Sequence, residues 1–223
     1  MPESHSKDLW TAVVTGGASG IGATVSRKLA SRGINDLIAH VSSELGEKLA
    51  EELKSTYRVD SIFLRVDVSK EADVQKMIET VVQKWGRLDY TANEAGASET
   101  TQFEEHSITT DHVDRAFAVN QRDVWLCQKL EAEQMMTQEP RAIELHPSPS
   151  STIKPQRGAI VNVSSITALT GMGFAAYAPT KHAVIGITQN GAFFYGGQGI
   201  RCDPIAPGGT VTAHDEGQSS RAI

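Results

Sequence analysis

The chain has 223 residues, of which 39% are hydrophobic and 22% are charged, a balance typical of folded globular proteins. Its formal charge of −6 argues against nucleic-acid binding, because nucleic-acid binders usually present a basic face. No stretch reaches the roughly 18 apolar residues that a membrane span needs, and no signal-peptide pattern is visible. With two cysteines and no metal-ligand spacing, we expect a reduced cytoplasmic protein without a metal site, although one disulfide remains possible.

Apolar runs alternate with helical patterns along the chain. Short apolar runs predict strands at 11–16, 36–41, 61–68, 88–96, 158–165 and near 200–207. Patterns with helical spacing predict helices at 22–33, 42–57, 71–86, 112–136 and 176–194. This alternation indicates an α/β fold, a doubly wound parallel sheet in three layers, with one domain over residues 1–223. A Pro- and Ser-rich segment at about 137–157 interrupts it and is predicted to be a surface loop insertion.

The sequence TGGASGIG lies between the first predicted strand and the first predicted helix. Gly16, Gly20 and Gly22 permit positive φ angles and a close approach of the backbone to a pyrophosphate. The helix that follows offers unpaired N–H groups and the positive end of its dipole. A glycine turn at this place in a βαβ unit therefore predicts a dinucleotide site, and the alternative is that the glycines serve only a tight turn.

The segment AAYAPTK holds Tyr177 and Lys181 four residues apart, which places both on one face of a helix. A tyrosine pKa near 10 is too high for acid–base work at neutral pH, and a neighbouring positive charge lowers it. Pro179 is tolerated if Tyr177 lies at the start of the helix, where backbone N–H groups are unpaired. The pair is thus predicted to be an acid–base unit at a helix start, with an ordinary surface pair as the alternative.

Together, TGGASGIG and AAYAPTK resemble the cofactor motif and the Tyr-x-x-x-Lys motif of the short-chain dehydrogenase/reductase family. Further segments that match the family in order are RVDVS, ANEAG, AVNQRDVW, NVSS and APGGTVT. The resemblance runs from residue 9 to about 212 and implies a Rossmann-like fold, an NAD(P) cofactor and a homodimer or homotetramer. It assigns cofactor contacts to Gly16, Ala18, Ser19, Gly20, Ile21, Gly22, His40, Ser42, Asp67, Val68, Asn93, Ala95, Gly96, Tyr177, Lys181, Pro207, Gly208, Thr210 and Thr212.

The same resemblance implies an oxidoreductase that transfers hydride between nicotinamide and a ketone or secondary alcohol. Its catalytic residues would be Asn120, Ser165, Tyr177 and Lys181, with Ser164 as the alternative serine. The serine would donate a hydrogen bond to the substrate oxygen, and Asn120 would hold a water that relays protons to Lys181. Two other functions stay open: a non-redox isomerase or cyclase, and a protein that senses dinucleotide without turnover.

Where many NAD-preferring members of the family place an aspartate, this chain has His40. No carboxylate would repel a 2′-phosphate there, and Ser42 offers a hydrogen-bond donor, although no arginine follows at once. NADP(H) is therefore favoured, with NAD(H) as the alternative. His40 as a plain strand residue without a cofactor role is an equally open reading.

Other departures concern the site and the end of the chain. Glu94 replaces the second asparagine of the family's Asn-Asn-Ala-Gly, and a carboxylate buried there without a partner is unfavourable. Pro204 removes a backbone donor from the last predicted strand, which is expected at a sheet edge. The family continues past the Pro-Gly turn with helices over the substrate, whereas this chain stops at Ile223. An open site, a site covered by a partner subunit and a loss of activity are all compatible with that.

Overall fold

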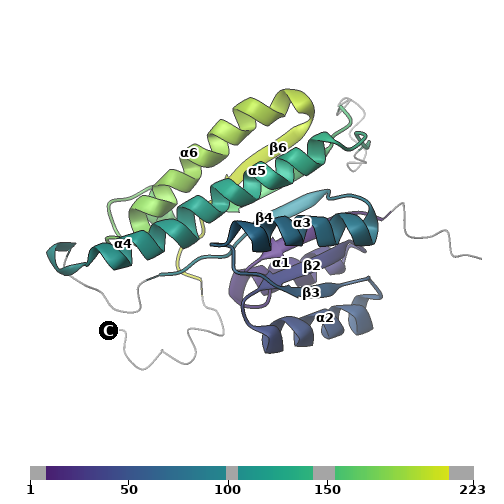
Figure 1. Cartoon of the computed structure of the whole chain (residues 1–223), viewed down its shortest axis with the longest axis horizontal. Helices are drawn as coiled ribbons and strands as arrows, with labels where there is room; N and C mark the ends of the chain where they lie inside the picture. The colour runs from purple at the N-terminus through teal and green to yellow at the C-terminus, as the bar shows by residue number, and fades with distance from the viewer. Residues whose placement is uncertain (1–8, 99–104, 143–153, 211–223) are drawn as a thin grey trace, which may run out of the picture.

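The computed structural model describes residues 9–98, 105–142 and 154–210. Within them, six parallel strands form one sheet in the order β3-β2-β1-β4-β5-β6. The chain crosses from β3 at one edge to β4 beside β1, which is the doubly wound arrangement predicted from the sequence (Figure 1). The strands are β1 (Thr11–Thr15), β2 (Asn35–His40), β3 (Ile62–Arg65), β4 (Tyr90–Asn93), β5 (Gly158–Val163) and β6 (Ile200–Ile205).

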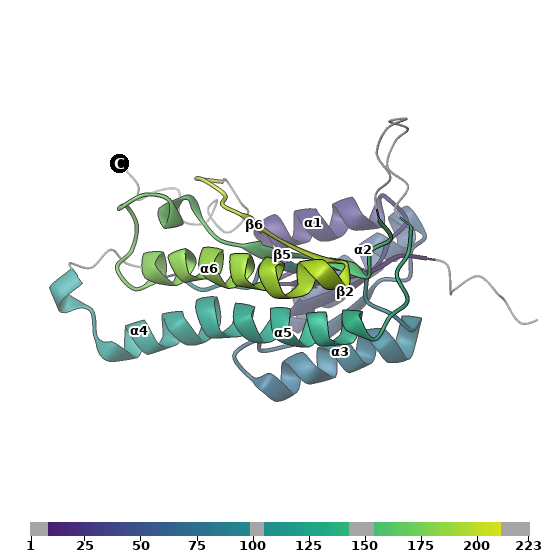
Figure 2. The ribbon, with the colours of Figure 1, turned by 90° about the horizontal axis from the view of Figure 1, so that it is seen from above.

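Helices cover both faces of this sheet. Figures 1 and 2 show α1 and α2 on one face and α3, α5 and α6 on the other, so the predicted three layers are confirmed. The helices are α1 (Gly20–Ala30), α2 (Ser43–Tyr57), α3 (Glu71–Trp85), α4 (Thr110–Phe117), α5 (Asp123–Met136) and α6 (Tyr177–Tyr195). Ser42 caps α2, since its Oγ accepts a hydrogen bond from the Leu45 N–H (3.5 Å).

The strands divide their side chains between two cores. In β2, Ile38 packs with α1 and α2, whereas Leu37 and Ala39 join the larger core under α3 and α5. Successive side chains of a strand point to opposite faces, so a continuous apolar run fits a strand that is buried on both sides. This burial holds the carboxyl ends of the strands at one edge of the sheet, where the predicted site residues follow them.

The helix predicted over 112–136 is divided in three. A π-helical segment, Ala118–Arg122, joins α4 to α5. Asn120 lies in it, and its side chain accepts a hydrogen bond from the Ala97 N–H and donates one to the Ala97 carbonyl (both 2.7 Å). π-helical turns are common at functional sites. Here the π-helical turn contains Asn120, whose side chain is hydrogen-bonded to the loop after β4.

Two strands end earlier than predicted, and the predicted insertion is tied down at its base. β3 and β4 end at Arg65 and Asn93, because the residues that follow turn away to form loops at the carboxyl edge. Arg141 and Gln156 exchange backbone hydrogen bonds (2.8 Å each), and the Gln138 side chain is buried. Residues 138–142 and 154–157 are therefore packed on the fold, while 143–153 lie outside the described residues.

β6 lies at an edge of the sheet, as Pro204 predicted. Ile200 and Cys202 are buried toward α5 and α6, whereas Arg201 and Asp203 point to the other face and are exposed. Within the described residues, no helix covers that second face of β6 (Figure 2). The sheet is thus fully enclosed around β1 and half enclosed at β6.

Candidate active site

The glycine turn after β1 leaves no room for side chains. Gly16 and Gly20 have φ angles of 66° and 52°, in the left-handed region. A Cβ on Gly16 would lie 2.9 Å from the Ala95 nitrogen, and a Cβ on Gly22 would meet the Gly16 carbonyl oxygen. Ser19 caps α1 with extended backbone but makes no side-chain cap hydrogen bond. A bare backbone before the N–H groups of a helix start is the arrangement that a pyrophosphate fits.

The end of β2 is linked to this turn through His40. Its Nδ1 accepts a hydrogen bond from the Ser42 N–H (3.0 Å), so the ring proton lies on Nε2, which faces the Ser19 Oγ at 3.4 Å. Burial lowers the pKa of His40 below its ordinary value. A neutral imidazole, not a carboxylate, therefore lies beside the position where an adenosine ribose would sit.

Arg65 is a residue that the sequence reasoning missed. It ends β3 and pairs in register with His40, and paired residues of parallel strands point to the same face. Phe63, two residues earlier, packs into the core under α1 and α2, which places Arg65 on that side too. The side chain is exposed and makes no hydrogen bond or ion pair within the described chain. Its position two residues before Asp67 was the available signal.

The turn after β3 is stabilised by Asp67, one of the predicted cofactor contacts. One carboxylate oxygen of Asp67 accepts hydrogen bonds from the Ser69 hydroxyl (2.6 Å) and N–H (3.2 Å), and the other pairs with Lys70 (3.3 Å). The hydrogen bond from Ser69 is the main cause that lowers the pKa of Asp67. Val68 buries its side chain in the main core, so its backbone is what it can offer to a ligand.

The loop after β4 brings Gly96 close to Asn120 and Lys181, two of the predicted catalytic residues, whereas the Asn93 side chain points into the protein. The Asn93 amide donates to the Glu131 carboxylate (3.0 Å) and to the Asn162 side chain (2.9 Å), and so ties β4 to α5 and β5. A Cβ on Gly96 would lie 3.2 Å from Asn120 Oδ1 and 3.6 Å from Lys181 Nζ. Asn93 thus holds the strand in place, and Gly96 is where the loop approaches the site.

Tyr177 is the first residue of α6, and Lys181 follows it by one turn. Pro179 lies in the first turn of the helix, where its missing N–H costs nothing. Lys181 is 4% exposed, and its Nζ lies 5.5 Å from the centroid of the Tyr177 ring while it donates a hydrogen bond to the Val163 carbonyl (2.8 Å). The predicted pair therefore lies at a helix start with its lysine buried.

The two candidate serines face different partners. The Ser165 hydroxyl lies near the Tyr177 phenol, and its Oγ accepts a hydrogen bond from the Thr167 N–H (3.2 Å). The Ser164 hydroxyl donates instead to the backbone carbonyl of Lys181 (2.7 Å). Only Ser165 is thus placed beside the predicted acid–base group. The Pro207 carbonyl accepts a hydrogen bond from the Ile166 N–H (2.9 Å), which brings the turn after β6 to the same edge.

The remaining predicted contacts lie around this edge or outside the described residues. Ala18 packs against the core under α1, Ala95 donates from its N–H to the Thr15 hydroxyl (3.2 Å), and Ile21 is half-buried in the first turn of α1. Gly208 and Thr210 are exposed, and the Thr210 hydroxyl donates to the Gly208 carbonyl (3.2 Å). Thr212 falls outside the described chain.

The expected lowering of the tyrosine pKa is wrong for this structure. Burial is the largest cause acting on Tyr177 and raises its pKa, the hydrogen bond with Ser165 lowers it, and the charge of Glu94 raises it further. The Lys181 ammonium donates a hydrogen bond to the Val163 carbonyl, and its charge is not among the causes that shift the pKa of Tyr177. Burial lowers the pKa of Lys181, and the charges of Asp123 and Glu94 oppose that lowering. Asp123 is another residue that the sequence reasoning missed.

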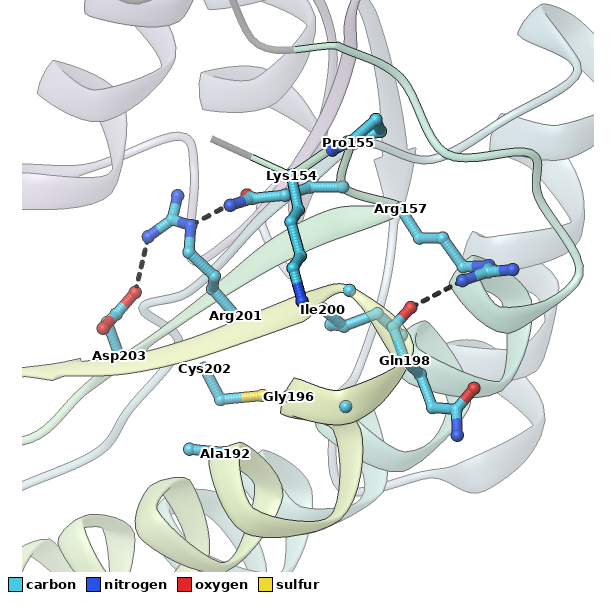
Figure 3. Close-up of a pocket in the computed structure, with 13 residues that line it drawn as sticks. Lys154, Pro155, Arg157, Ala192, Gly196, Gln198, Ile200, Arg201, Cys202 and Asp203 are labelled. Atoms are coloured by element: carbon cyan, nitrogen blue, oxygen red, sulfur yellow. Dashed lines mark hydrogen bonds and ion pairs between the residues drawn. The ribbon is translucent and has the colours of Figure 1, made fainter. Parts of the chain in front are cut away.

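A pocket of about 490 Å³ lies away from these residues, beside the start of β6 and the end of α6 (Figure 3). Among its charged groups, Arg201 contacts Asp203 (2.8 Å) and Gln156 (3.0 Å), Arg157 donates to the Gln198 carbonyl (2.7 Å), and Lys154 also lines the pocket. Within residues 9–98, 105–142 and 154–210, no cluster suited to a metal ion occurs, and no helix is long and apolar enough to span a membrane. Cys127 and Cys202 are unpaired.

Several known proteins are similar to this chain. Momilactone A synthase from Oryza sativa subsp. japonica is 33% identical over 202 residues, which are 90% of this chain and 66% of that protein. The 3beta-hydroxysteroid dehydrogenase 2 of Eggerthella lenta is also 33% identical, over 91% of this chain and 71% of its own length. The chain thus spans about two-thirds of the length of these curated relatives.

Solved structures give the same result. Levodione reductase has a TM-score of 0.80 at 30% identity, over 94% of this chain and 75% of the other. The structure of ElxO with NADP bound has a TM-score of 0.79 at 30% identity, over 95% and 78%. The family model described as "short chain dehydrogenase" matches residues 10–222. These findings confirm the predicted fold, the oxidoreductase family and its nicotinamide cofactor class, and the chain belongs to the short-chain dehydrogenase/reductase family.

Proposed function

We propose that the protein is an NAD(P)-dependent carbonyl reductase or alcohol dehydrogenase that acts on a ketone or secondary alcohol. The observation that carries this proposal is that Tyr177 begins α6, with Lys181 buried one turn on and the Ser165 hydroxyl near the phenol. The glycine turn follows the carboxyl end of β1, and Ser165 follows the carboxyl end of β5, so both lie at the same edge of the parallel sheet. A nicotinamide ring supplies or accepts the hydride when it is bound.

In the direction of reduction, the chain's own groups handle the substrate oxygen. The Ser165 hydroxyl donates a hydrogen bond to that oxygen, where negative charge develops. Tyr177 transfers its phenolic proton to the same oxygen as a general acid. Asn120 shares its amide with Ala97 next to Lys181, so it positions the loop on which Gly96 lies.

The cofactor would lie along the carboxyl edge. The residues that would hold it are those of the glycine turn for the pyrophosphate, Asp67 and Val68 for the adenine, Ala95 and Gly96 beneath the dinucleotide, Lys181 for the nicotinamide ribose, and Pro207, Gly208, Thr210 and Thr212 for the nicotinamide. Backbone groups dominate this set, which suits a ligand that approaches glycines closely.

NADP(H) is the cofactor that this proposal favours. A neutral His40 beside Ser19 offers donors and no repelling carboxylate, and Ser42 lies at the N-terminus of α2. Arg65 adds a cation on the same side of the sheet with no protein partner in the described chain. Arginine binds phosphate oxygens well because its planar guanidinium presents several donors.

We also propose a cytoplasmic homodimer or homotetramer that associates through the helices α4 to α6. Phe117, Trp125 and Phe193 expose 40%, 52% and 81% of their surface on these helices, and exposed aromatic side chains are enriched at interfaces. Light scattering should give at least twice the mass of the chain, and a monomer would contradict this part of the proposal.

The first experiment is a titration of the purified protein with NADPH and with NADH, followed by nicotinamide fluorescence. Tighter binding of NADPH, followed by its oxidation with members of a ketone panel, is the expected result. Binding without oxidation by any carbonyl compound would favour the dinucleotide sensor. Failure to bind either nucleotide would overturn the proposal.

A further inference from the structure

Three large apolar side chains are exposed in the loop that joins Ser165 to Tyr177. Ile166, Leu169 and Met172, here called the apolar rim, leave 46%, 67% and 72% of their surface accessible. Figure 2 shows this loop between β5 and the start of α6, beside the chain that leaves β6. Single exposed apolar side chains are ordinary on a protein surface, whereas several gathered beside a reacting centre indicate a binding surface.

Polar groups of this loop are bonded within the loop itself. The Ile166 carbonyl accepts hydrogen bonds from the Leu169 N–H (3.0 Å) and from the Thr170 hydroxyl (3.3 Å). The Thr170 hydroxyl oxygen in turn accepts one from the Met172 N–H (3.4 Å). The turn is therefore closed by its own polar groups, and large apolar side chains are what it presents to solvent.

Both ends of the loop are held beside the reacting groups. At one end, Ser165 Oγ accepts a hydrogen bond from the Thr167 N–H (3.2 Å). At the other end, the Cβ position of Gly173 lies 2.9 Å from Thr167 Cγ2 and 3.2 Å from the Cβ of Ala178, the residue after Tyr177. The loop thus turns back on itself, and its two ends meet between the serine and the tyrosine.

The apolar rim is close to these anchor points. Leu169 follows Thr167 by two residues, and Met172 precedes Gly173 by one. Since neighbouring Cα atoms are about 3.8 Å apart, the Cα atoms of Leu169 and Met172 lie within roughly 8 Å of an anchor point. A molecule whose oxygen is bound at the serine and the tyrosine therefore has the apolar rim within reach of its next few carbon atoms.

The surroundings of the apolar rim carry no charge along two segments of the chain. Residues 158–180 and 204–210 contain no acidic, basic or histidine residue. The Ile166 N–H donates to the Pro207 carbonyl (2.9 Å), so the two segments lie side by side. Lys181 follows the first of them, but it is 4% exposed and its ammonium is bonded to a backbone carbonyl. These segments offer no free cation to a carboxylate or phosphate of a substrate.

A substrate fits this surface better than the other candidate occupants do. Residues 211–223 contain only two large apolar side chains, Val211 and Ile223, so their composition does not match an apolar surface. The exposed aromatic side chains proposed for subunit association, Phe193 among them, lie on helices α4 to α6 and not in this loop. A substrate bound by Ser165 and Tyr177, in contrast, must lie beside the loop that joins them.

We propose that Ile166, Leu169 and Met172 bind the hydrocarbon body of the substrate, and that the protein acts on uncharged hydrophobic ketones and alcohols in preference to carbonyl compounds that carry a carboxylate or phosphate. The substrate oxygen lies between Ser165 and Tyr177, and the hydrocarbon extends across the apolar rim. This inference rests on the proposed function and names the substrate class of the same site.

The first test measures NADPH-dependent reduction of two series of ketones. Unbranched 2-alkanones from 2-butanone to 2-decanone should show a kcat/KM that rises with length, by up to about fourfold for each methylene group that is buried. Keto acids with the same number of carbon atoms should be reduced at least about tenfold less efficiently, because a carboxylate loses hydration against an apolar surface. Equal efficiencies for the two series would contradict the proposal.

A charge placed on the apolar rim should change this preference. Leu169→Lys should lower kcat/KM for 2-decanone about tenfold and raise it for the keto acid of the same length, and Met172→Lys is a second variant with the same expectation. Leu9→Lys is the matched control, since Leu9 is also exposed but precedes β1, at the opposite edge of the sheet. An equal loss on both substrates, or no change on either, would contradict the proposal.

A binding measurement separates this inference from the proposed function. Tertiary 2-methyl-2-alkanols cannot be oxidised by hydride transfer, because their carbinol carbon bears no hydrogen. Calorimetric titration of the protein with NADP⁺ present should show affinity that rises with chain length and falls in Leu169→Lys. This result without turnover of any ketone would support the apolar rim and overturn the redox function.

Two other results would overturn the inference. Turnover of ketones without a dependence on chain length would do so and leave the function standing. A smaller mass of Leu169→Lys in light scattering, with ketone kinetics unchanged, would assign the apolar rim to a partner subunit instead. Neither binding nor turnover would overturn both proposals.

Discussion

The two halves of the sheet are built in different ways. Around β1 and β2, helices cover both faces, and the predicted ligand contacts are mostly backbone groups and glycines. At β6, the described chain covers one face of the sheet, and the chemistry predicted beside β5 and β6 depends on side chains of α6 and of the neighbouring loops. The first half offers backbone groups that are held by packing on both faces of the sheet. The second half depends on Tyr177 and Lys181, whose protonation is affected by burial. Changes in the two halves should therefore separate binding from turnover.

The largest effect is expected in the second half, from Tyr177→Phe. Loss of a general acid should lower turnover by about 10²–10⁴-fold, because the Ser165 hydroxyl at the same oxygen is too weak an acid to replace the phenol as proton donor. NADPH affinity measured by fluorescence should stay nearly unchanged. Tyr57→Phe, at the end of α2, is the matched control. Normal turnover in the Tyr177 variant would remove this residue from the mechanism.

In the first half, Gly22→Ala should damage binding. The new Cβ would meet the Gly16 carbonyl oxygen, which is backbone, so the turn itself must shift. We expect dinucleotide affinity to fall at least about tenfold, which corresponds to about 1.4 kcal/mol. Gly186→Ala in α6 is a useful control, since nothing lies within 4 Å of its Cβ position. Unchanged NADPH binding in the Gly22 variant would show that the turn does not form the site.

These two positions show what the sequence can predict. Gly22 could be recognised because the demand on it is local: a strand, a glycine turn and a helix follow one another, and each has its own pattern. Tyr177 could be recognised by its spacing from Lys181. The raised pKa of Tyr177 could not, because it depends on burial and on Glu94, which is distant in sequence. The π turn at Asn120 likewise needs Ala97 brought to it by folding.

A smaller effect, again in the first half, is expected from Arg65→Ala. If this side chain holds a 2′-phosphate, NADPH affinity should fall about three- to tenfold while NADH affinity stays the same. The measurement is the ratio of the NADH and NADPH dissociation constants in the variant and in the wild type. The difference between the two proteins should become smaller as the salt concentration is raised, because salt screens the attraction between Arg65 and the phosphate. Arg32→Ala, an exposed change just past the other end of α1, controls for net charge. Equal losses for both nucleotides would contradict a role in phosphate selection.

A further change concerns stability and not function, through Asp36 in β2. This carboxyl group is 0% exposed, neither of its oxygens has a hydrogen-bond partner within the described residues, and burial raises its pKa from 3.8 to about 7. Between about pH 4 and pH 7 the folded protein therefore holds a proton that the unfolded chain has released. Since the unfolded chain then binds fewer protons, this group lowers the free energy of unfolding as pH rises through that window.

Asp36→Asn should abolish this contribution and leave the variant more stable than the wild type above pH 7, by at most about 4 kcal/mol at about 1.4 kcal/mol per pKa unit. Urea denaturation at pH 5 and at pH 8 measures it. The Asp36→Asn variant keeps other buried acids, Glu131 among them. Its stability therefore still falls as pH rises, but less steeply than that of the wild type. Asp203→Asn, exposed beside Arg201, should leave the slope unchanged. A gain that is equal at both pH values would trace to packing, because only a titrating carboxyl group makes the gain grow with pH.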